Sequence, residues 1–378
     1  MIDGDLVSVR IAGTEDSPRL AWAVGLDVSL PSDVAAIVAQ AKHVGDEGPP
    51  NFASGSAAAG ALRLRAAFTP TPPTSSRLPF SYQTVPLRLR TWIGHLIGRV
   101  QRARVGSWAS YPRWPLDLSA DFLADLYGLP PSPFATGPTP VLLSHDIDTP
   151  EGLRNLVHDF LPIEEAVGAR SSNYIVPCAW QIDHALLGEV AKRRHEVGIH
   201  GYDHANRTPF APASERQQRL MAARPLIERY DIIGYRAPSL LRTSVLLQEL
   251  AKLYRYDSSI PTSGGLFPVP NNGCASARPF QCGGIVEIPL TLPRDGSLRF
   301  LGHGPREIVS IWRGCAERIA ASGGVVSLLT HCEQRFSGNP PMLDAYRRFL
   351  DFLATDHRFE FATPVSVLET VCTAGVTV

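Results

Sequence analysis

Short apolar segments alternate with amphipathic segments along most of the chain that follows the proline-rich stretch Pro130–Pro140. The apolar segments predict strands, namely Val141–Leu143, Asn173–Val176, Val197–Ile199, Ile232–Tyr235, Tyr254–Tyr256, Ile285–Ile288, Val325–Leu329 and Phe359–Ala362. Helical periodicity falls between most of them, in Pro150–Ala169, Gln181–Arg194, Ser214–Tyr230, Ser244–Leu253, Arg306–Ala321 and Pro341–Thr355. Strands that alternate with helices form parallel sheets, and about seven or eight such units are enough to close a barrel. We therefore expect an α/β fold built as a closed or nearly closed barrel.

Residues 1–135 lack this regularity and include a low-complexity stretch, Gly48–Pro79, rich in Pro, Ala, Ser and Thr. Such a composition is typical of a long loop or linker. We therefore expect two parts. Residues 1–135 form an N-terminal extension or small extra domain of uncertain fold, and residues 136–378 form the barrel.

One segment of the N-terminal part, residues 87–104, has a clear helical period. Its apolar residues at that spacing are Trp92, Ile93, Leu96, Ile97 and Val100, and its arginines are Arg88, Arg90, Arg99, Arg102 and Arg104. Two interpretations are open. The lack of a flanking anchor favours an amphipathic helix docked on the barrel with its arginines in solvent. The alternative is peripheral contact with a membrane or a phosphorylated lipid carrier.

Composition excludes several classes of protein. The 36 basic and 36 acidic side chains cancel, and no stretch interleaves aromatic and basic residues, so we expect no nucleic-acid partner. The chain begins without an apolar signal segment and nowhere reaches the ~20 apolar residues of a membrane helix, so we expect a cytoplasmic protein. The six cysteines form no CxxC pair, which argues against a cysteine-bound zinc and a disulfide scaffold. Nothing in the sequence indicates the oligomeric state.

Polar clusters directly follow several of the predicted strands. They are His145–Asp148, His200–His204, Arg236–Ser239, Tyr256–Ser259 and Thr330–Glu333. The carboxyl ends of all strands in a parallel barrel open on one face, where active sites are built. We therefore expect these distant clusters to converge.

Two of the clusters have the composition of a metal site. His200 and His204 are four residues apart, so a single helical turn would place both imidazoles on one side. Alternation along a strand would place the Asp146 and Asp148 carboxylates on one side, where a cation relieves their repulsion. Two histidines and one carboxylate leave open positions for water and substrate. For one of the two aspartates, capping of the helix that begins at Pro150 remains an alternative.

The segments HDID, HGYDH, RAP, YDSS and LLTH, in this order and spacing, resemble the motifs of the NodB-homology polysaccharide deacetylases, carbohydrate esterase family four. The resemblance covers about residues 140–370. It implies a distorted (β/α)7 barrel, a divalent metal bound by one Asp and two His, and hydrolysis of N-acetyl or related amides. This chain departs from the commonest family pattern by placing Ile147 between its two aspartates.

Carried over position by position, the resemblance implies three metal ligands, Asp148, His200 and His204. It implies that Asp146 is the catalytic base, that Arg236 orients this base, that His331 is the general acid and that Asp257 supports His331. Zn²⁺ is the expected ion, with Co, Ni, Mn or Fe as alternatives.

The expected reaction is metal-dependent hydrolysis of an N-acyl amide, N-acetyl in the first place, on an amino sugar or glycan precursor, which releases acetate and a free amine. Two other functions stay open. One is a deformylase or other amide hydrolase acting on a lipid-linked aminosugar. The other is a catalytically silent, sugar-binding module with the same fold.

Overall fold

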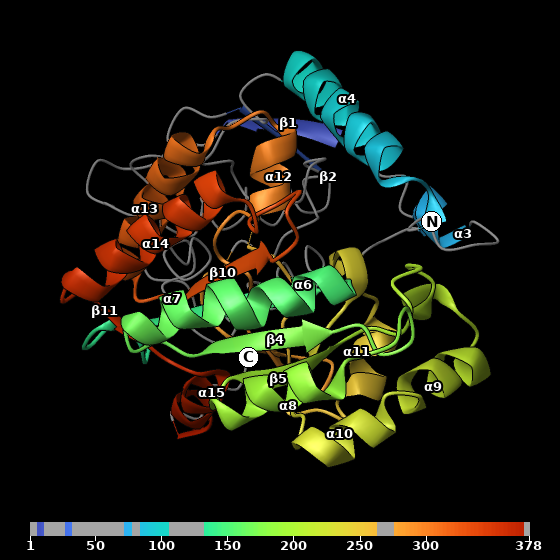
Figure 1. Ribbon diagram of the computed structural model, residues 1–378. Coiled ribbons are helices and arrows are strands. Elements are labelled where there is room, and N and C mark those ends of the chain that lie inside the picture. Colours follow the sequence, from blue (N-terminus) through green and yellow to red (C-terminus); the bar gives the residue numbers. More distant parts are fainter. Residues whose placement is uncertain are drawn as a thin grey trace, which may run out of the picture.

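The computed structural model describes residues 6–10, 27–31, 72–77, 84–105, 132–262 and 276–373. These residues contain a nine-stranded sheet of order β10-β3-β4-β5-β6-β7-β9-β8, with β11 beside β3. Its strands are β3 (Thr139–Ile147), β4 (Ser171–Ile175), β5 (Glu196–His200), β6 (Gly234–Arg236), β7 (Tyr256–Asp257), β8 (Phe280–Cys282), β9 (Ile285–Glu287), β10 (Val326–His331) and β11 (Phe359–Phe361). All neighbouring strands run parallel except β8 and β9. The sheet curls into a partial barrel with helices around its outside (Figure 1), which confirms the predicted distorted (β/α)7 fold.

The segment that follows β9 completes the barrel against β10 without a regular ladder. The backbone N–H groups of Thr291 and Leu292 donate to the Ser327 carbonyl at 3.3 and 3.0 Å, and Ser327 N–H donates to Thr291 Oγ1 at 2.7 Å. Pro289 and Pro293 flank these residues. Since proline has no N–H to donate, it interrupts strand pairing. The distortion of the barrel therefore has a local cause in the sequence.

Helices link the strands and cover the outer face of the sheet. They are α6 (Pro150–Asn155), a π-helical segment (Leu156–Phe160), α7 (Leu161–Ala166), α8 (His184–Lys192), α9 (Ala213–Met221), α10 (Arg224–Tyr230), α11 (Ser244–Leu250), α12 (Asp295–Phe300), α13 (Pro305–Ser322), α14 (Pro340–Thr355) and α15 (Pro364–Thr373). Several begin at a side-chain cap that the sequence provides. Thr149, Asp183, Thr243 and Asn339 each accept a hydrogen bond from a backbone N–H of the first turn.

The main apolar core lies between the sheet and these helices. Phe160, Trp312 and Phe349 are fully buried there, together with strand residues such as Leu143 and Ile199. Full burial of a large apolar side chain stabilises a fold by roughly 1.5–3 kcal/mol. This core holds the carboxyl ends of the strands, and therefore the polar clusters, in fixed positions.

The N-terminal part contains an antiparallel pair, β1 (Leu6–Arg10) and β2 (Asp27–Pro31), and the short helix α3 (Thr74–Arg77). The helix α3 falls within the low-complexity stretch, most of which lies outside the described residues. The division into residues 1–135 and 136–378 stays a prediction. Within the described part of the chain, no helix has the length and apolar character needed to cross a bilayer.

The predicted helix of this part is present as α4 (Leu87–Val105) and packs on α12, as expected, but with the opposite face. The face in contact carries Gly94 and Gly98, both buried, whereas Trp92 is 61% exposed. A Cβ atom on Gly94 would lie 2.6 Å from Phe300, and one on Gly98 would collide with the Phe300 carbonyl oxygen. Because only glycine permits this approach, the apolar stripe points away from the barrel. Arg88 and Arg99 are exposed, as the docked interpretation expected, but the apolar stripe does not form the contact with the barrel.

Candidate metal centre and active site

Side chains from the ends of four strands meet at one mouth of the barrel. Asp146 lies near the end of β3, His200 ends β5, Arg236 ends β6 and His331 ends β10. Their strands are neighbours in the sheet order, except that β4 lies between β3 and β5. Parallel pairing therefore brings together residues that are far apart in the sequence, as the strand-end clusters predicted.

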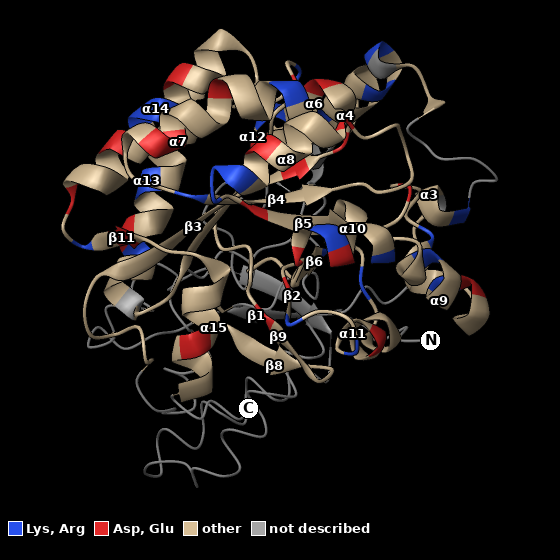
Figure 2. Cartoon of the chain, turned by 60° about the horizontal axis from the view of Figure 1, so that its bottom comes forward, with Lys and Arg blue, Asp and Glu red and all other residues tan. Residues whose placement is uncertain are grey.

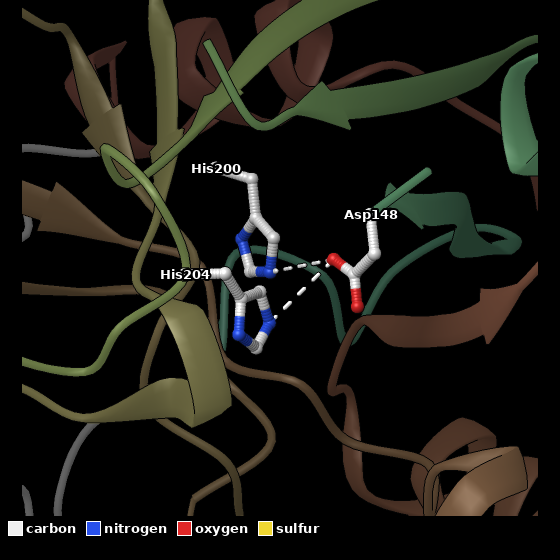
Figure 3. Close-up of side chains that lie close together, drawn as sticks. All are labelled: Asp148, His200 and His204. Atoms are coloured by element: carbon white, nitrogen blue, oxygen red, sulfur yellow. Dashed lines mark ion pairs between the residues drawn. The ribbon is translucent and has the colours of Figure 1, made fainter. Parts of the chain in front are cut away.

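Asp148, His200 and His204 form a buried cluster of potential metal ligands (Figure 3). One ligand atom from each lies within 4.8 Å of the others. Asp148 Oδ1 is 3.6 Å from His200 Nε2 and 3.5 Å from His204 Nε2. Asp148 Oδ1 and His200 Nε2 are buried and have no hydrogen-bond partner among the described residues. A divalent cation would satisfy both atoms, so the three residues fit a metal ion.

The tautomer of His200 also suits a metal ligand. Its Nδ1 lies 3.0 Å from the Arg236 carbonyl oxygen, which can only accept a hydrogen bond, so Nδ1 carries the proton. The unprotonated Nε2 then faces Asp148. Such a bond to the second ring nitrogen fixes the orientation of metal-binding histidines in general.

The HxxxH pair does not lie on a helical turn, so that part of the expectation was wrong. Residues 202–206 form bends, and the backbone is left-handed at Gly201 (φ 67°) and at His204 (φ 56°). A Cβ atom at Gly201 would collide with the ring of Pro238 in the RAP segment. The left-handed backbone at His204 costs roughly 1–2 kcal/mol for a residue other than glycine. The chain accepts this strain at the position that turns His204 toward Asp148.

Asp146 lies beside the cluster and is held by a buried ion pair. Arg236 Nη1 donates to Asp146 Oδ1 at 3.0 Å, and Asp146 Oδ2 lies 3.5 Å from His200 Nε2. Burial would raise the pKa of Asp146, but the electrostatic effects of the neighbouring His200 ring, of Arg236 and of His331 outweigh burial and lower it to about 2. Arg236 also donates to the carbonyl and hydroxyl oxygens of Ser258 and stacks on the Tyr174 ring at 4.0 Å. The arrangement keeps Asp146 ionised and fixed in place.

His331 is paired with Asp295, the first residue of α12. Its Nδ1 and its backbone N–H both lie 2.8 Å from the Asp295 carboxylate, which also accepts from Ser337 Oγ at 2.8 Å. Burial would lower the pKa of His331, but the Asp295 carboxylate, together with Asp146 and Asp148, raises it to about 9. The imidazole is therefore protonated at neutral pH.

The structure assigns to Asp295 the contact that we expected of Asp257. Asp257 ends β7, accepts a hydrogen bond from Ser259 Oγ at 2.7 Å and lies opposite Glu287 on β9. Burial raises the pKa of Asp257, and burial next to Asp257 raises the pKa of Glu287 as well. The Asp257–Glu287 pair lies between two neighbouring strands of the sheet. Asp295 was missed in the sequence because it does not directly follow a predicted strand.

A second residue that sequence reasoning left without a role is Glu333, at the end of the THCE cluster. Its side chain is buried, and Oε1 accepts a hydrogen bond from Thr149 Oγ1 at 2.9 Å. Its Oε2 has no hydrogen-bond partner among the described residues. Burial and the negative charge of Asp148 raise the pKa of Glu333 to about 7. Its place in the Thr330–Glu333 cluster, directly after a predicted strand, was the sequence signal that could have identified Glu333.

Comparison with known proteins supports the fold. No family model matches the sequence, and no curated protein is significantly similar to it. Among solved structures, a Mycobacterium smegmatis protein named provisionally as a polysaccharide deacetylase has a TM-score of 0.52 at 19% identity and covers 64% of this chain and 93% of its own. Puue allantoinase has a TM-score of 0.53 at 16% identity, with 71% and 100% covered. A probable polysaccharide deacetylase from Pseudomonas aeruginosa PAO1 has a TM-score of 0.52 at 14% identity, with 70% and 98% covered. The chain has the fold of the NodB-type polysaccharide deacetylases.

Proposed function

We propose that this chain is a metal-dependent amide hydrolase that removes an N-acyl group, in the first place acetyl, from an amino sugar or glycan precursor. The observation that carries the proposal is the buried cluster of Asp148, His200 and His204 between an ionised carboxylate, Asp146, and a protonated imidazole, His331. A cation site, a base and an acid at one mouth are the groups that amide hydrolysis requires.

Asp148, His200 and His204 hold the metal, with Zn²⁺ as the first choice for a site of two imidazoles and one carboxylate. When bound, the ion supplies the Lewis-acid chemistry that makes a water molecule acidic enough for a base as weak as Asp146. Asp146 accepts the proton of the water that attacks the amide carbonyl. Arg236 positions Asp146 through their buried ion pair.

His331 donates the proton that the leaving nitrogen needs as the carbon–nitrogen bond breaks. An amine leaves readily only when protonated, and the Asp295 carboxylate favours the protonated form of His331 by raising its pKa. Asp295 positions the imidazole and fixes its tautomer through Nδ1. The products are a carboxylic acid, acetate in the first place, and a free amine.

The test is turnover of N-acetylated mono- and oligosaccharides, and of nucleotide- and lipid-linked forms, with and without a chelator. We expect chelation and His200→Ala each to abolish release of acetate, and Zn²⁺ to restore the chelated protein but not the variant. His158→Ala is the matched control because His158 is exposed and lies outside the cluster. Turnover by the His200→Ala protein would refute the metal assignment.

A second candidate substrate is a lipid-linked aminosugar, from which the acyl group removed could be formyl. The observation that favours it is the exposed apolar face of α4. Mass-spectrometric identification of the released acid, formate or acetate, separates the two acyl groups. A chain that binds the metal but hydrolyses none of these substrates would instead be a silent sugar-binding module.

A further inference from the structure

The helix α4 presents an unusual concentration of apolar side chains to solvent. Five of the six large hydrophobic residues that are exposed in the described part of the chain lie on it: Leu89 47%, Trp92 61%, Ile93 38%, Leu96 44% and Val100 43%. At about 100° per residue, these positions form one stripe along the helix. We call this stripe, residues 89, 92, 93, 96 and 100, the apolar face of α4. Scattered exposed hydrophobics are ordinary, but a continuous stripe of this kind marks an interaction site.

The packing of α4 fixes this face outward. The opposite side of the helix sits on α12 through Gly94 and Gly98, and His95 contacts the Phe300 ring edge-on at 5.4 Å. A side chain larger than hydrogen at either glycine would meet Phe300. Rotating the helix to bury its apolar face would therefore drive large side chains into the space that the glycines occupy. The exposure follows from the sequence of the helix itself.

The charge of α4 has a single sign. Its sequence carries Arg88, Arg90, Arg99, Arg102 and Arg104 and contains no Asp or Glu. Arg88 and Arg99 are both exposed and lie along one edge of the apolar face, next to Trp92. Figure 2 marks Lys and Arg in blue, the arginines of α4 among them. An apolar stripe edged by arginines, with an exposed Trp, is the pattern of a helix that lies in a membrane interface.

We propose that the apolar face of α4 docks on a membrane surface rich in anionic lipid. The apolar side chains enter the boundary between headgroups and acyl chains, and the arginines contact the negatively charged headgroups. A second copy of this chain is a poorer occupant, since it would bring like-charged arginines together. The helix lies on the bilayer and does not cross it.

The docking helix is held beside the mouth of the barrel. The Phe300 ring contacts His95 of α4 and, at 6.1 Å, the Phe336 ring. Phe336 in turn contacts His331 at 4.8 Å. Figure 1 shows α4 lying against the end of the molecule that carries α12. A substrate anchored in the same membrane would meet the site close to the surface; this consequence, unlike the docking itself, rests on the proposed function.

The test is flotation of the purified full chain with vesicles of phosphatidylcholine alone or of equal parts phosphatidylcholine and phosphatidylglycerol. We expect binding to the anionic vesicles that weakens with salt, and little binding to phosphatidylcholine. Trp92→Glu and Leu96→Glu should each weaken binding by about tenfold or more, because each places a negative charge in the apolar face. Val245→Glu is the matched control: Val245 is the sixth exposed large hydrophobic, on α11, and its replacement should leave binding unchanged.

Four results would overturn the proposal: no binding to anionic vesicles, equal binding to both vesicle types, undiminished binding by the two α4 variants, or a dimer that Trp92→Glu dissociates. A loss of thermal stability in Trp92→Glu without vesicle binding would show that another segment of this chain covers the face. The His200→Ala protein should bind vesicles like the wild type, so vesicle binding is measured independently of turnover.

Discussion

Replacing Asp295 with Asn should lower the pKa of His331 by about two units. Burial alone would lower the pKa of this imidazole, and the Asp295 carboxylate is the largest of the groups that raise it to about 9. Asparagine carries no charge and keeps only one acceptor oxygen, so it also loses either the hydrogen bonds accepted at Oδ1 or those accepted at Oδ2. Two pKa units correspond to roughly 3 kcal/mol of interaction between the charged imidazole and its surroundings.

The direction of the pH dependence follows from the same shift. The pKa of His331 is raised from an ordinary value of 6.5 to about 9 in the folded chain, so folding favours the protonated form. The stabilisation is therefore complete below about pH 6.5 and is lost as the pH rises through about 9. We expect the Asp295→Asn protein to be less stable than the wild type in acid and neutral solution, with a difference that shrinks toward alkaline pH.

The assay is an NMR titration of the histidine ring signals, with His331→Gln to assign the resonance. It is made on chelator-treated protein, because a cation bound near Asp148 would itself lower the pKa of His331. Asp257→Asn is the comparator: it removes a buried carboxylate that bonds Ser259 rather than His331. It should leave the pKa of His331 near its wild-type value. An unchanged pKa in Asp295→Asn, or an equal drop in both variants, would refute the assignment of Asp295.

Two further predictions concern stability, one for the buried ion pair of the site and one for the packing of α4 on α12. Arg236→Met should destabilise the fold by about 3–5 kcal/mol in urea unfolding, because it leaves Asp146 buried without its partner. Adding Asp146→Asn should restore part of this loss, and a purely additive double variant would contradict the reasoning. Gly98→Ala should cost about 1–3 kcal/mol in thermal unfolding, because its Cβ meets the Phe300 carbonyl. Gly188→Ala, in α8 with open space around it, should be neutral or stabilising; equal effects of the two substitutions would contradict the packing argument.

The sequence predicted the barrel and the convergence of Asp148, His200 and His204 for reasons that the structure makes clear. A buried parallel strand is a short apolar run, and the residue that follows it must lie at the carboxyl edge of the sheet. Local pattern therefore placed the Asp146–Asp148 segment and His200 at this edge, whereas the choice of Asp148 as the metal ligand came from the family resemblance and stays a prediction. The alternation of a strand also placed Asp146 on the same side as Asp148, and both carboxylates lie 3.5–3.6 Å from His200 Nε2.

The missed features depend on contacts between distant segments. Asp295 begins a helix of six residues after a stretch broken by Pro289 and Pro293, so neither strand nor helix periodicity marks it. The sequence contains both Asp257 and Asp295, and either carboxylate could have paired with His331. The path of the chain after β9 places Asp295 beside it. For α4, the apolar stripe predicted the helix but not which face packs. The spacing of Gly94 and Gly98 was the sequence signal for the packed face. The two glycines lie on the same side of the helix, and only there can a neighbouring backbone approach closely.

Polar groups at the mouth of the barrel fall into two kinds, and the difference indicates how the site works. Asp295 is fully buried, and its two oxygens accept from His331, Gly296 and Ser337. By contrast, Asp148 Oδ1 and Glu333 Oε2 are buried without a hydrogen-bond partner among the described residues. A buried unpaired polar atom costs roughly 1–3 kcal/mol. Asp295, which positions His331, thus has hydrogen-bond partners on both oxygens. Asp148 Oδ1 and Glu333 Oε2 have none among the described residues. An external ligand that pairs with these atoms would remove this cost, and a divalent cation beside Asp148 Oδ1 is a ligand of that kind.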